Sequence, residues 1–518
     1  MSIYDYIIIG GGISGLFMTY KLSETGAKIL VVESSGRWGG RIYTKKEKGL
    51  QFELGAGRIS SKHTKVINLL KELDLDNDLI KLPSKINYKI KGSKVNFYSL
   101  VKELIDESKL YTKKYLQNVN LKQICIDTLG HDGSDILQNK LGYDSEFNYL
   151  NAHYGLKSLK RDLFSVTDYF VMKNGLSCII DKLVKILDEK ENVKLKLDCH
   201  VTDIGKNFVQ INKKKKYGSN IICCTPYNTL KQFTKFKDIL EIETVKPIPL
   251  IRIYAKYPKD KSGKVWFHNL PRTITDNYIR HIIPIDYESG LIMISYTDGL
   301  YADMWSNLSN LGNKVLIEHL HKEIKEVLNK DLPKPEFITS YYWSAGVHMW
   351  RPGFNVKEVY KKILKPFEEK IYVVNEAYSK HQSWIEGSLE SSYDVLELID
   401  PKFKRNISKG GAKEKVKRKS KVYTIKEVLK KRNWIILDIK KQLRIYDVGK
   451  WLNEHPGGAD NLKRGIKANK YYLNKEKYPE SPIQLFKQIG THMSNRVIQK
   501  MLLKDNDKIK YIGVLKKV

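Results

Sequence analysis

The chain has 518 residues, of which 42% are hydrophobic and 11% aromatic, and its formal net charge is +33. This length exceeds the usual size of one hydrophobic core, so we expect two or more domains. No stretch approaches the roughly 20 consecutive apolar residues that a membrane-spanning helix needs, and the sequence therefore predicts no transmembrane segment.

The cysteine pattern and the N-terminus indicate the compartment. Five cysteines occur without paired spacing, which argues against a disulfide framework: Cys125, Cys178, Cys199, Cys223 and Cys224. The first apolar run, Tyr6 to Ile9, lacks a basic leader and passes directly into glycines, so we interpret it as a buried strand and not as a signal peptide. We expect an intracellular, cytoplasmic protein.

The N-terminal segment has the pattern of a strand, a glycine turn, a helix and a second strand. The first strand covers Tyr4 to Ile9, the helix runs to Thr25 with Gly26 as its stop, and the second strand covers Lys28 to Glu33. This βαβ order predicts an α/β fold with a Rossmann-like dinucleotide-binding domain.

Three glycines directly after the first strand fit the pattern G-x-G-x-x-G: Gly10, Gly12 and Gly15. Small residues at these positions let the backbone turn tightly and let a pyrophosphate approach the N-terminus of the helix. Glu33 ends the next strand 18 residues past Gly15, where a carboxylate can accept hydrogen bonds from the hydroxyls of an adenosine ribose. The segment therefore predicts a dinucleotide site.

The residues that follow this segment indicate that the dinucleotide is FAD and not NAD. Glu33, Arg37, Gly40, Arg41 and Thr44 match E-x-x-x-R-x-G-G-R-x-x-T, a motif that resembles that of the flavin amine oxidases. The fold that this resemblance implies is a glutathione-reductase-type FAD domain with a mixed-sheet substrate domain. The two arginines can meet the charge of the diphosphate, while the glycines allow close approach of the backbone.

The segment Glu53 to Ile59 resembles E-x-G-A-M-R-hydrophobe of L-amino acid oxidases, in which the arginine binds the carboxylate of the substrate. The matching residue here is Arg58. A guanidinium suits this role through its two-pronged geometry and permanent charge. The alternative interpretation is a structural arginine.

Further elements follow along the chain. We expect mainly helical structure over 65–165, a hairpin over Lys194 to Asn212 and a buried strand over Ser219 to Cys224. Three strands of a mixed sheet are expected over Leu250 to Tyr257, Tyr278 to Ile285 and Leu291 to Tyr296, followed by a helix over Asn313 to Leu328.

The strand at Leu250 resembles the family's strand that places a lysine opposite the flavin N5, but the residue here is Arg252. Because an arginine keeps its proton, water-assisted chemistry and the reaction with oxygen are open questions.

Residues 371–389 resemble the closing motif of the same family, G-E-x-x-S…G-W-I-E-G-A-L. The resemblance assigns Glu376 to the ribityl-phosphate region of FAD. Trp384, together with the aromatic residues of 341–350, is a candidate for the wall of the flavin's substrate face, and the alternative interpretation is a core aromatic residue. Asn375 and Ser383 stand where the family usually has glycine. Because the last cysteine is Cys224, covalent attachment in this region is excluded and FAD is expected to bind non-covalently.

The resemblance covers about residues 1–400 and implies a division into FAD-binding parts (about 1–75, 165–226 and 350–400) and substrate-domain parts (about 76–164 and 227–349). Residues 401–421 hold 10 Lys+Arg and one Glu with almost no apolar residues, which predicts a flexible basic linker. Residues 401–518 carry 32 Lys+Arg against 10 Asp+Glu, so +22 of the charge lies there. An acidic protein, an anionic membrane surface and nucleic acid are open as partners, and so is the alternative of AT-rich coding.

The segment 422–518 resembles the cytochrome b5 family, a small α+β fold. The resemblance rests on Tyr446, Trp451 and the run His455-Pro456-Gly-Gly, followed by a second histidine at His492. It implies a haem b with His455 and His492 as axial ligands, although the second ligand lies further along the chain than is usual for the family. With both axial positions filled by protein, one-electron transfer is the expected role.

These observations favour an FAD-dependent amine oxidase or dehydrogenase that converts an amine, in particular an amino acid, to an imine and passes electrons to haem. Two alternatives stay open. One is a desaturase or dehydrogenase that acts on a C–C bond, and the other is a flavo-haemoprotein without turnover that serves as a basic interaction module.

Overall fold

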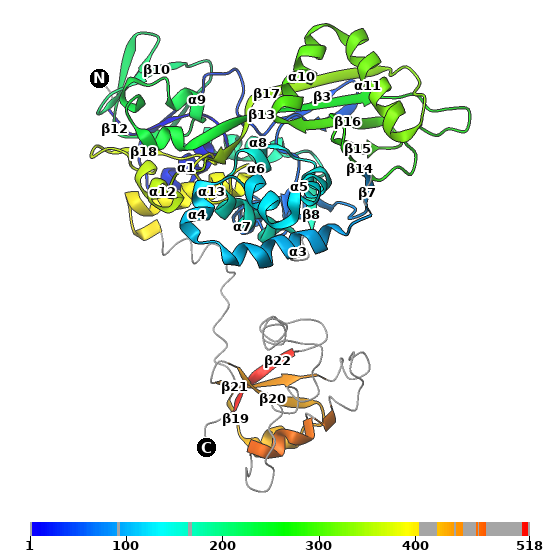
Figure 1. Cartoon of the computed structure of the whole chain (residues 1–518). Coiled ribbons are helices and arrows are strands. Elements are labelled where there is room, and N and C mark those ends of the chain that lie inside the picture. The colour runs from blue at the N-terminus through cyan, green and yellow to red at the C-terminus, as the bar shows by residue number, and fades with distance from the viewer. Residues whose placement is uncertain are drawn as a thin grey trace. The chain divides into compact units, whose positions relative to one another are not determined.

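The computed structural model describes residues 3–90, 94–163, 168–403, 422–439, 442–448, 463–464, 466–472 and 510–515. The chain divides into two compact units, Met1–Gly411 and Ala412–Val518, whose elements Figure 1 labels. The division falls within the basic segment 401–421 in which the sequence predicts a linker. None of the helices in the described ranges is long and apolar enough to cross a membrane.

The first sheet of the larger unit contains the predicted βαβ unit. Strands β9, β2, β1, β12 and β18 are parallel neighbours, and β11 and β10 continue the sheet from β12 in antiparallel pairing. The bounds are β1 (Tyr4–Ile9), β2 (Ile29–Val32), β9 (Val193–Lys196), β10 (Val201–Ile204), β11 (Phe208–Ile211), β12 (Lys214–Cys223) and β18 (Ile371–Val373).

Both faces of this sheet are covered. Because side chains alternate along a strand, Ile8 of β1 packs in one hydrophobic cluster and Ile7 packs in another. The cluster around Ile8 includes residues of three helices, α1 (Ile13–Ser23), α8 (Ser177–Asp188) and α13 (Ile385–Ile399). Apolar runs such as those of β1 and β2 are what strands buried on both faces require.

A second, mixed sheet has the strand order β17-β13-β16-β15-β14-β7, antiparallel except for the pair β14 and β7. Its strands are β7 (Ile86–Lys89), β13 (Val245–Lys256), β14 (Arg272–Thr275), β15 (His281–Asp286), β16 (Leu291–Asp298) and β17 (Phe337–Trp350). In Figure 1 these strands lie together with α10 and α11.

The two faces of the second sheet have different neighbours. Ile253 of β13 belongs to a cluster that includes residues of two helices, whereas its neighbour Tyr254 packs with Phe52 and Leu54 of a hairpin segment. The elements concerned are α10 (Gly299–Asn310), α11 (Asn313–Leu328), β3 (Thr44–Glu47) and β4 (Leu50–Glu53). The hairpin therefore joins the first part of the chain to one face of the second sheet.

The remaining elements of the larger unit are mainly helical. A three-stranded sheet has the order β5-β8-β6, with β5 (Ile59–Ser60), β6 (Leu79–Lys81) and β8 (Tyr169–Met172). The helices are α2 (Thr64–Glu72), α3 (Phe97–Glu107), α4 (Lys113–Asn118), α5 (Leu121–Leu141), α6 (Ser145–Asn148), α7 (Ala152–Leu163), α9 (Tyr227–Leu230) and α12 (Val356–Ile363). Helix α5 is kinked at Gly130, whose φ is +70°.

The smaller unit contains a four-stranded sheet with the order β19-β22-β21-β20. Helix α15 starts with a capping box, in which the Thr424 hydroxyl accepts from the Glu427 N–H and the Glu427 carboxylate accepts from the Thr424 N–H. The elements are β19 (Val422–Tyr423), α15 (Ile425–Leu429), β20 (Trp434–Ile439), β21 (Gln442–Asp447), the 3₁₀ helix η6 (Ala468–Tyr472) and β22 (Lys510–Leu515).

Several predicted elements differ from the structure. The predicted hairpin over 194–212 is wrong in its first strand, because β9 pairs with β2 in the parallel sheet and only β10 and β11 form a hairpin. The strand predicted to begin at Tyr278 begins at His281, because Arg280 has a φ of +58° and belongs to a turn. The helix predicted over Asn313–Leu328 is confirmed as α11.

Candidate functional site

The turn between β1 and α1 requires glycine at two of the three motif positions. Gly10 has a φ of +105°, which side chains other than glycine rarely adopt. A Cβ atom on Gly15 would overlap with the carbonyl oxygen of Gly10. Glycine at these two positions therefore keeps the turn tight, and α1 begins a few residues after the end of β1.

Gly12 leaves open space in front of the helix. It is the N-cap of α1, and no side chain caps the first turn. The second glycine pair lies beside it, since Gly39 forms a parallel bridge with Gly12 and the Gly39 N–H donates to the Gly11 carbonyl at 2.8 Å. A Cβ on Gly12 would meet no protein atom nearer than the Gly39 oxygen at 3.9 Å. This cradle of free N–H groups and absent side chains fits the pyrophosphate of a dinucleotide.

Glu33 lies at the end of β2, next to the glycine turn. Its carboxylate accepts from the Gly11 N–H at 2.7 Å and from the Ser35 N–H at 2.9 Å. The residue is partly exposed, so oxygen lone pairs stay accessible from the cradle side. This position suits hydrogen bonds from ribose hydroxyls, as the sequence predicts.

The two arginines of the second motif have different partners. Arg37 donates to carbonyl groups of its own loop, including that of Gly40 at 2.6 Å, and its guanidinium stacks 3.9 Å from the centre of the Tyr43 ring. Arg41 forms an ion pair with Glu376 and donates to the Gly346 carbonyl at 3.0 Å. Arg37 thus holds the shape of the loop, and Arg41 links the loop to the segment after β18.

Glu376 is 4% exposed and connects three parts of the chain. Besides Arg41, it contacts His348 Nδ1 at 2.6 Å and accepts from the Ser383 N–H at 2.9 Å. Burial alone would raise its pKa, but Arg41 and His348 outweigh burial and lower the pKa of Glu376 to about 2. Its carboxylate therefore stays charged and fixes the loop that precedes α13.

The two residues that stand at family glycine positions are accommodated differently. Ser383 has a φ of +71°, so the backbone has the left-handed conformation that favours glycine. Asn375 is buried and its side-chain amide donates to the Thr225 carbonyl at 2.9 Å. Trp384 follows as the N-cap of α13, and no side-chain hydrogen bond caps that helix.

Arg58 lies among aromatic rings. Its guanidinium carbon is 4.9 Å from the centre of the Tyr169 ring and 5.5 Å from that of Trp384, and it donates to the Tyr143 hydroxyl at 3.4 Å. Within the described residues it pairs with no carboxylate. The structure thus brings the predicted carboxylate-binding arginine next to the predicted aromatic wall.

Arg252 lies on β13, close to the segment that carries Arg58. It donates to the Glu53 carbonyl at 2.9 Å, and a Cβ on Gly57 would lie 2.7 Å from its Nη1. Its guanidinium stacks 4.8 Å from the Tyr296 ring centre. Burial would lower the pKa of Arg252, but Tyr254, Tyr296 and Glu53 outweigh burial and raise it, so the side chain stays protonated.

Residues that no motif singled out complete the surroundings of Arg58. His281 and Tyr296 face Tyr143, with ring centres 4.7 Å and 5.7 Å from it, and Arg272 interacts with Arg58. Each comes from a different strand or loop, and none stands in a pattern with its sequence neighbours. No local signal in the sequence could have identified them.

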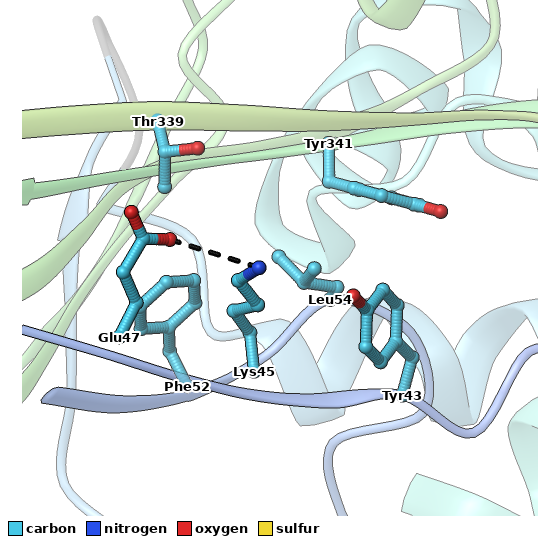
Figure 2. A pocket seen from close by; sticks show the side chains of 7 residues that line it. All are labelled: Tyr43, Lys45, Glu47, Phe52, Leu54, Thr339 and Tyr341. Atoms are coloured by element: carbon cyan, nitrogen blue, oxygen red, sulfur yellow. Dashed lines mark ion pairs between the residues drawn. The ribbon is translucent and has the colours of Figure 1, made fainter. Parts of the chain in front are cut away.

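A separate pocket of about 150 Å³ opens between the β3–β4 hairpin and β17 (Figure 2). Lys45 and Glu47 form an ion pair at 3.9 Å in it, and both side chains are 40% exposed. None of the predicted site residues lines this pocket.

The predicted haem ligands, His455 and His492, lie outside the described residues. Within the described ranges, no group of three or more His, Cys, Asp or Glu residues could hold a metal ion. The two-histidine haem site stays a prediction from the sequence.

Comparisons with known proteins point to one family for the larger unit. A family model described as flavin containing amine oxidoreductase matches residues 13–395. The flavin-containing amine oxidase A of Equus caballus is 32% identical over 95 residues, which span only 18% of this chain and 18% of that protein. The L-amino-acid oxidase of Crotalus adamanteus is 23% identical over 455 residues, covering 74% of this chain and 84% of that protein.

Among solved structures, a protein from Exiguobacterium sp. 255-15 that is assigned as a protoporphyrinogen oxidase has a similar fold. The TM-score is 0.60 at 14% sequence identity, and the match covers 78% of this chain and 100% of that chain. At this identity the similarity shows the fold alone, and the fold it supports is the mixed α/β architecture of the larger unit.

Proposed function

The chain belongs to the flavin-containing amine oxidoreductase family, and we propose that it uses non-covalently bound FAD to oxidise an amino acid to an imine. The observation that carries this proposal is Arg58, a partly buried guanidinium with no carboxylate partner among the described residues, stacked on Trp384. Such a cation favours a substrate that brings its own carboxylate, and it would repel a polyamine.

The residues around the glycine cradle support binding of FAD. The open space at Gly12 and the uncapped start of α1 suit the pyrophosphate, and Glu33 suits the ribose. Trp384 and the N-terminus of α13 suit the flavin ring, because the partial positive charge of a helix N-terminus stabilises negative charge. In this assignment Glu376 and Arg41 brace the loops that enclose the cofactor.

The proposed reaction removes a hydrogen with two electrons from the substrate's α-carbon and a proton from its amine, so that a C=N bond forms. FAD, when bound, supplies the acceptor for that hydrogen and its electrons. Water then hydrolyses the imine to a 2-oxo acid and ammonium, and an external oxidant, either oxygen or a one-electron carrier, reoxidises the cofactor. The task of Arg58 is to hold the carboxylate so that the α-carbon faces the flavin.

Arg252 sets a limit on this chemistry. Because its guanidinium keeps its proton, Arg252 holds positive charge at the site but cannot accept a proton from the amine. The proton of the amine must therefore pass to water. Dehydrogenation of a C–C bond, the second candidate function, meets the same limit, since the neighbouring carbon would have to lose a proton to a base other than Arg252.

Substitution of Arg58 tests the amino-acid proposal. We expect the wild-type flavin to be bleached anaerobically by an amino acid, and R58Q to need roughly 10- to 100-fold more amino acid because a charged hydrogen bond is lost. R58K should lie between the two, since a lysine keeps the charge but not the two-pronged geometry. An amine of the same skeleton without the carboxylate should reduce wild type and R58Q alike.

A matched control removes an exposed charge nearby. Lys81 on β6 is 61% exposed and pairs with Asp168 next to β8, so K81Q changes the net charge but not the site. K81Q should behave as wild type. If R58Q retains its flavin and is bleached by amino acids as easily as wild type, Arg58 is structural and the proposal fails.

For the smaller unit we propose a haem b with His455 and His492 as axial ligands, on the strength of the His-Pro-Gly-Gly run and its sequence context. A two-histidine haem has no open iron position, so the unit would take electrons one at a time from the larger one. The absorption spectrum of the purified full-length chain should contain a six-coordinate haem band in addition to the flavin bands. H455A should lose that band and keep the flavin bands, and a wild-type spectrum with flavin alone would contradict the proposal.

A further inference from the structure

One face of the second sheet carries an unusual number of arginines near Arg58. Arg252 of β13 is paired in register with Tyr296 of β16, and directly opposed residues of neighbouring strands point to the same face. On β15 and β14, His281 is paired with Ile274, and Arg272 lies two residues before Ile274, also on that face. We name Arg58, Arg252 and Arg272 the arginine cluster.

Ring contacts connect Arg58 and Arg252, and Arg272 interacts electrostatically with Tyr143 of the same group. Tyr143 accepts from Arg58 and lies 4.7 Å from the His281 ring, whose centre is 5.8 Å from that of Tyr296. Tyr296 in turn stacks against Arg252. The cluster therefore surrounds a single group of aromatic side chains on the face that continues from the hairpin-covered part of the sheet.

Arg272 has the fewest partners in the cluster. Arg58 stacks on two rings, and Arg252 stacks on one ring and donates to a carbonyl. In the described part of the chain, Arg272 forms no ion pair and no cation–π contact, and its Nε is shielded from solvent without a hydrogen-bond partner. The residue as a whole is partly exposed, and its two terminal nitrogens have no hydrogen-bond partner among the described residues, so their N–H donors remain available to a ligand.

Nearby titratable groups do not neutralise the cluster. Burial, together with Arg272, Arg58 and Arg280, lowers the pKa of His281 far below its usual value, so the ring is uncharged. Burial raises the pKa of Tyr296 to about 12, and it therefore stays protonated.

Two carboxylates beside the aromatic group and the cluster are already engaged. Asp144, which follows Tyr143, forms an ion pair with Arg280. The Glu53 carboxylate accepts from the Leu176 N–H at 2.7 Å and from the Thr44 hydroxyl at 2.9 Å. Glu53 also interacts with Arg252, whereas Arg58 and Arg272 pair with no carboxylate among the residues that the structure describes. Sheltering two such guanidinium groups is costly, and anionic groups of a substrate would offset that cost.

We propose that the substrate is an amino dicarboxylic acid, with Arg58 binding the α-carboxylate and Arg272 binding the second acid group. The proposal rests on the proposed function for the amine of the substrate and for the role of Arg58, and the site at Arg272 is new. Arg58 lies against Trp384, on the side predicted to face the flavin, and Arg272 lies on β14, next to the edge strand β7. A molecule with two acid groups offers one carboxylate to each arginine, whereas a single carboxylate satisfies only one of them with two-pronged geometry.

The test uses non-oxidisable ligands, so its result does not depend on turnover. Isothermal titration of the FAD-loaded, full-length chain compares succinate and glutarate with butyrate and valerate, which have the same chain lengths and one carboxylate. We expect one of the dicarboxylates to bind roughly 10- to 100-fold more tightly than the monocarboxylate of equal length, because a second charge-assisted contact forms.

Variants assign the effect to residues. R272Q should remove the preference for the dicarboxylate and leave binding of the monocarboxylate unchanged, while R272K should keep part of the preference. The control K89Q removes an exposed charge from β7, where Lys89 is paired with Thr275 of β14 and thus lies opposite to the Arg272 face. K89Q should leave both affinities unchanged.

The outcomes separate the two proposals. Equal affinity of wild type for dicarboxylates and monocarboxylates overturns the second-acid site, even if R272Q and R272K fail to fold. A preference that persists in R272Q overturns the role of Arg272. A dicarboxylate preference lost in R272Q supports the site whether or not any amine bleaches the flavin, and absence of bleaching by every amino acid refutes amine oxidation alone.

Discussion

At the scale of single residues, Ser383 shows how the chain differs from its family without loss of the local geometry. Its φ of +71° is the conformation for which the family uses glycine, and its N–H still reaches the Glu376 carboxylate at 2.9 Å. A side chain with a Cβ atom in the left-handed region costs about 1–2 kcal/mol. The Glu376 network must therefore hold Ser383 against this strain.

The variant S383G should relieve that strain. We expect the free energy of unfolding, measured by urea denaturation with FAD bound, to rise by about 1 kcal/mol. The control S388G places glycine inside α13, where it should lower the free energy of unfolding by roughly 0.5–1 kcal/mol. Equal destabilisation by both variants would show that Ser383 is not strained.

At the residue scale, the sequence predicts candidate site residues only where they stand in motifs. Arg58 is such a candidate because the segment from Glu53 to Ile59 resembles a known pattern, and in the structure it lies beside Trp384. Arg272 is 214 positions further along the chain and stands alone between Pro271 and Thr273. Only the pairing of β14 with β15 brings it to the same face as His281, and such long-range pairing is not encoded locally.

At the scale of elements, the start of α1 is the feature that the sequence predicted best. The βαβ order and the glycine spacing follow from local rules on turns and strand periodicity, and β1, α1 and β2 occur where they are expected. The helix ends at Ser23, two residues before the predicted end at Thr25. The division of 194–212 into β9 and a separate hairpin could not be predicted, because parallel pairing with β2 is decided by tertiary contacts.

Gly12 and Gly15 allow a test that separates cofactor binding from folding. A Cβ on Gly12 would enter the open cradle without touching protein closer than 3.9 Å, and its φ of −75° suits any residue. G12A should therefore keep the thermal midpoint of the FAD-free protein and weaken FAD binding roughly 10-fold or more, measured by fluorescence titration.

G15A is the matched comparison, because its Cβ would overlap with the Gly10 carbonyl in the absence of any cofactor. It should lower the thermal midpoint of the FAD-free protein. If G12A binds FAD as wild type does, the pyrophosphate does not lie in front of α1.

At the scale of the whole molecule, the charge is distributed unevenly over the chain. Residues 401–518 account for +22 of the total of +33, whereas the arginine cluster is a local feature of the larger unit. We expect salt to affect the two regions differently, since exposed charges are screened and partly buried pairs much less so. Binding of a dicarboxylate at Arg58 and Arg272 should depend less on ionic strength than any contact made by residues 401–421.

The central claim is that an amino acid reduces the flavin of this chain. The most direct measurement is anaerobic titration of the full-length, FAD-loaded protein with amino acids, in which the visible absorption of the flavin and the 2-oxo acid formed are followed together. We predict that an amino dicarboxylic acid bleaches the flavin and that one 2-oxo acid and one ammonium form per flavin reduced. A flavin that dithionite bleaches, but that no amino acid bleaches at any concentration, would contradict the account.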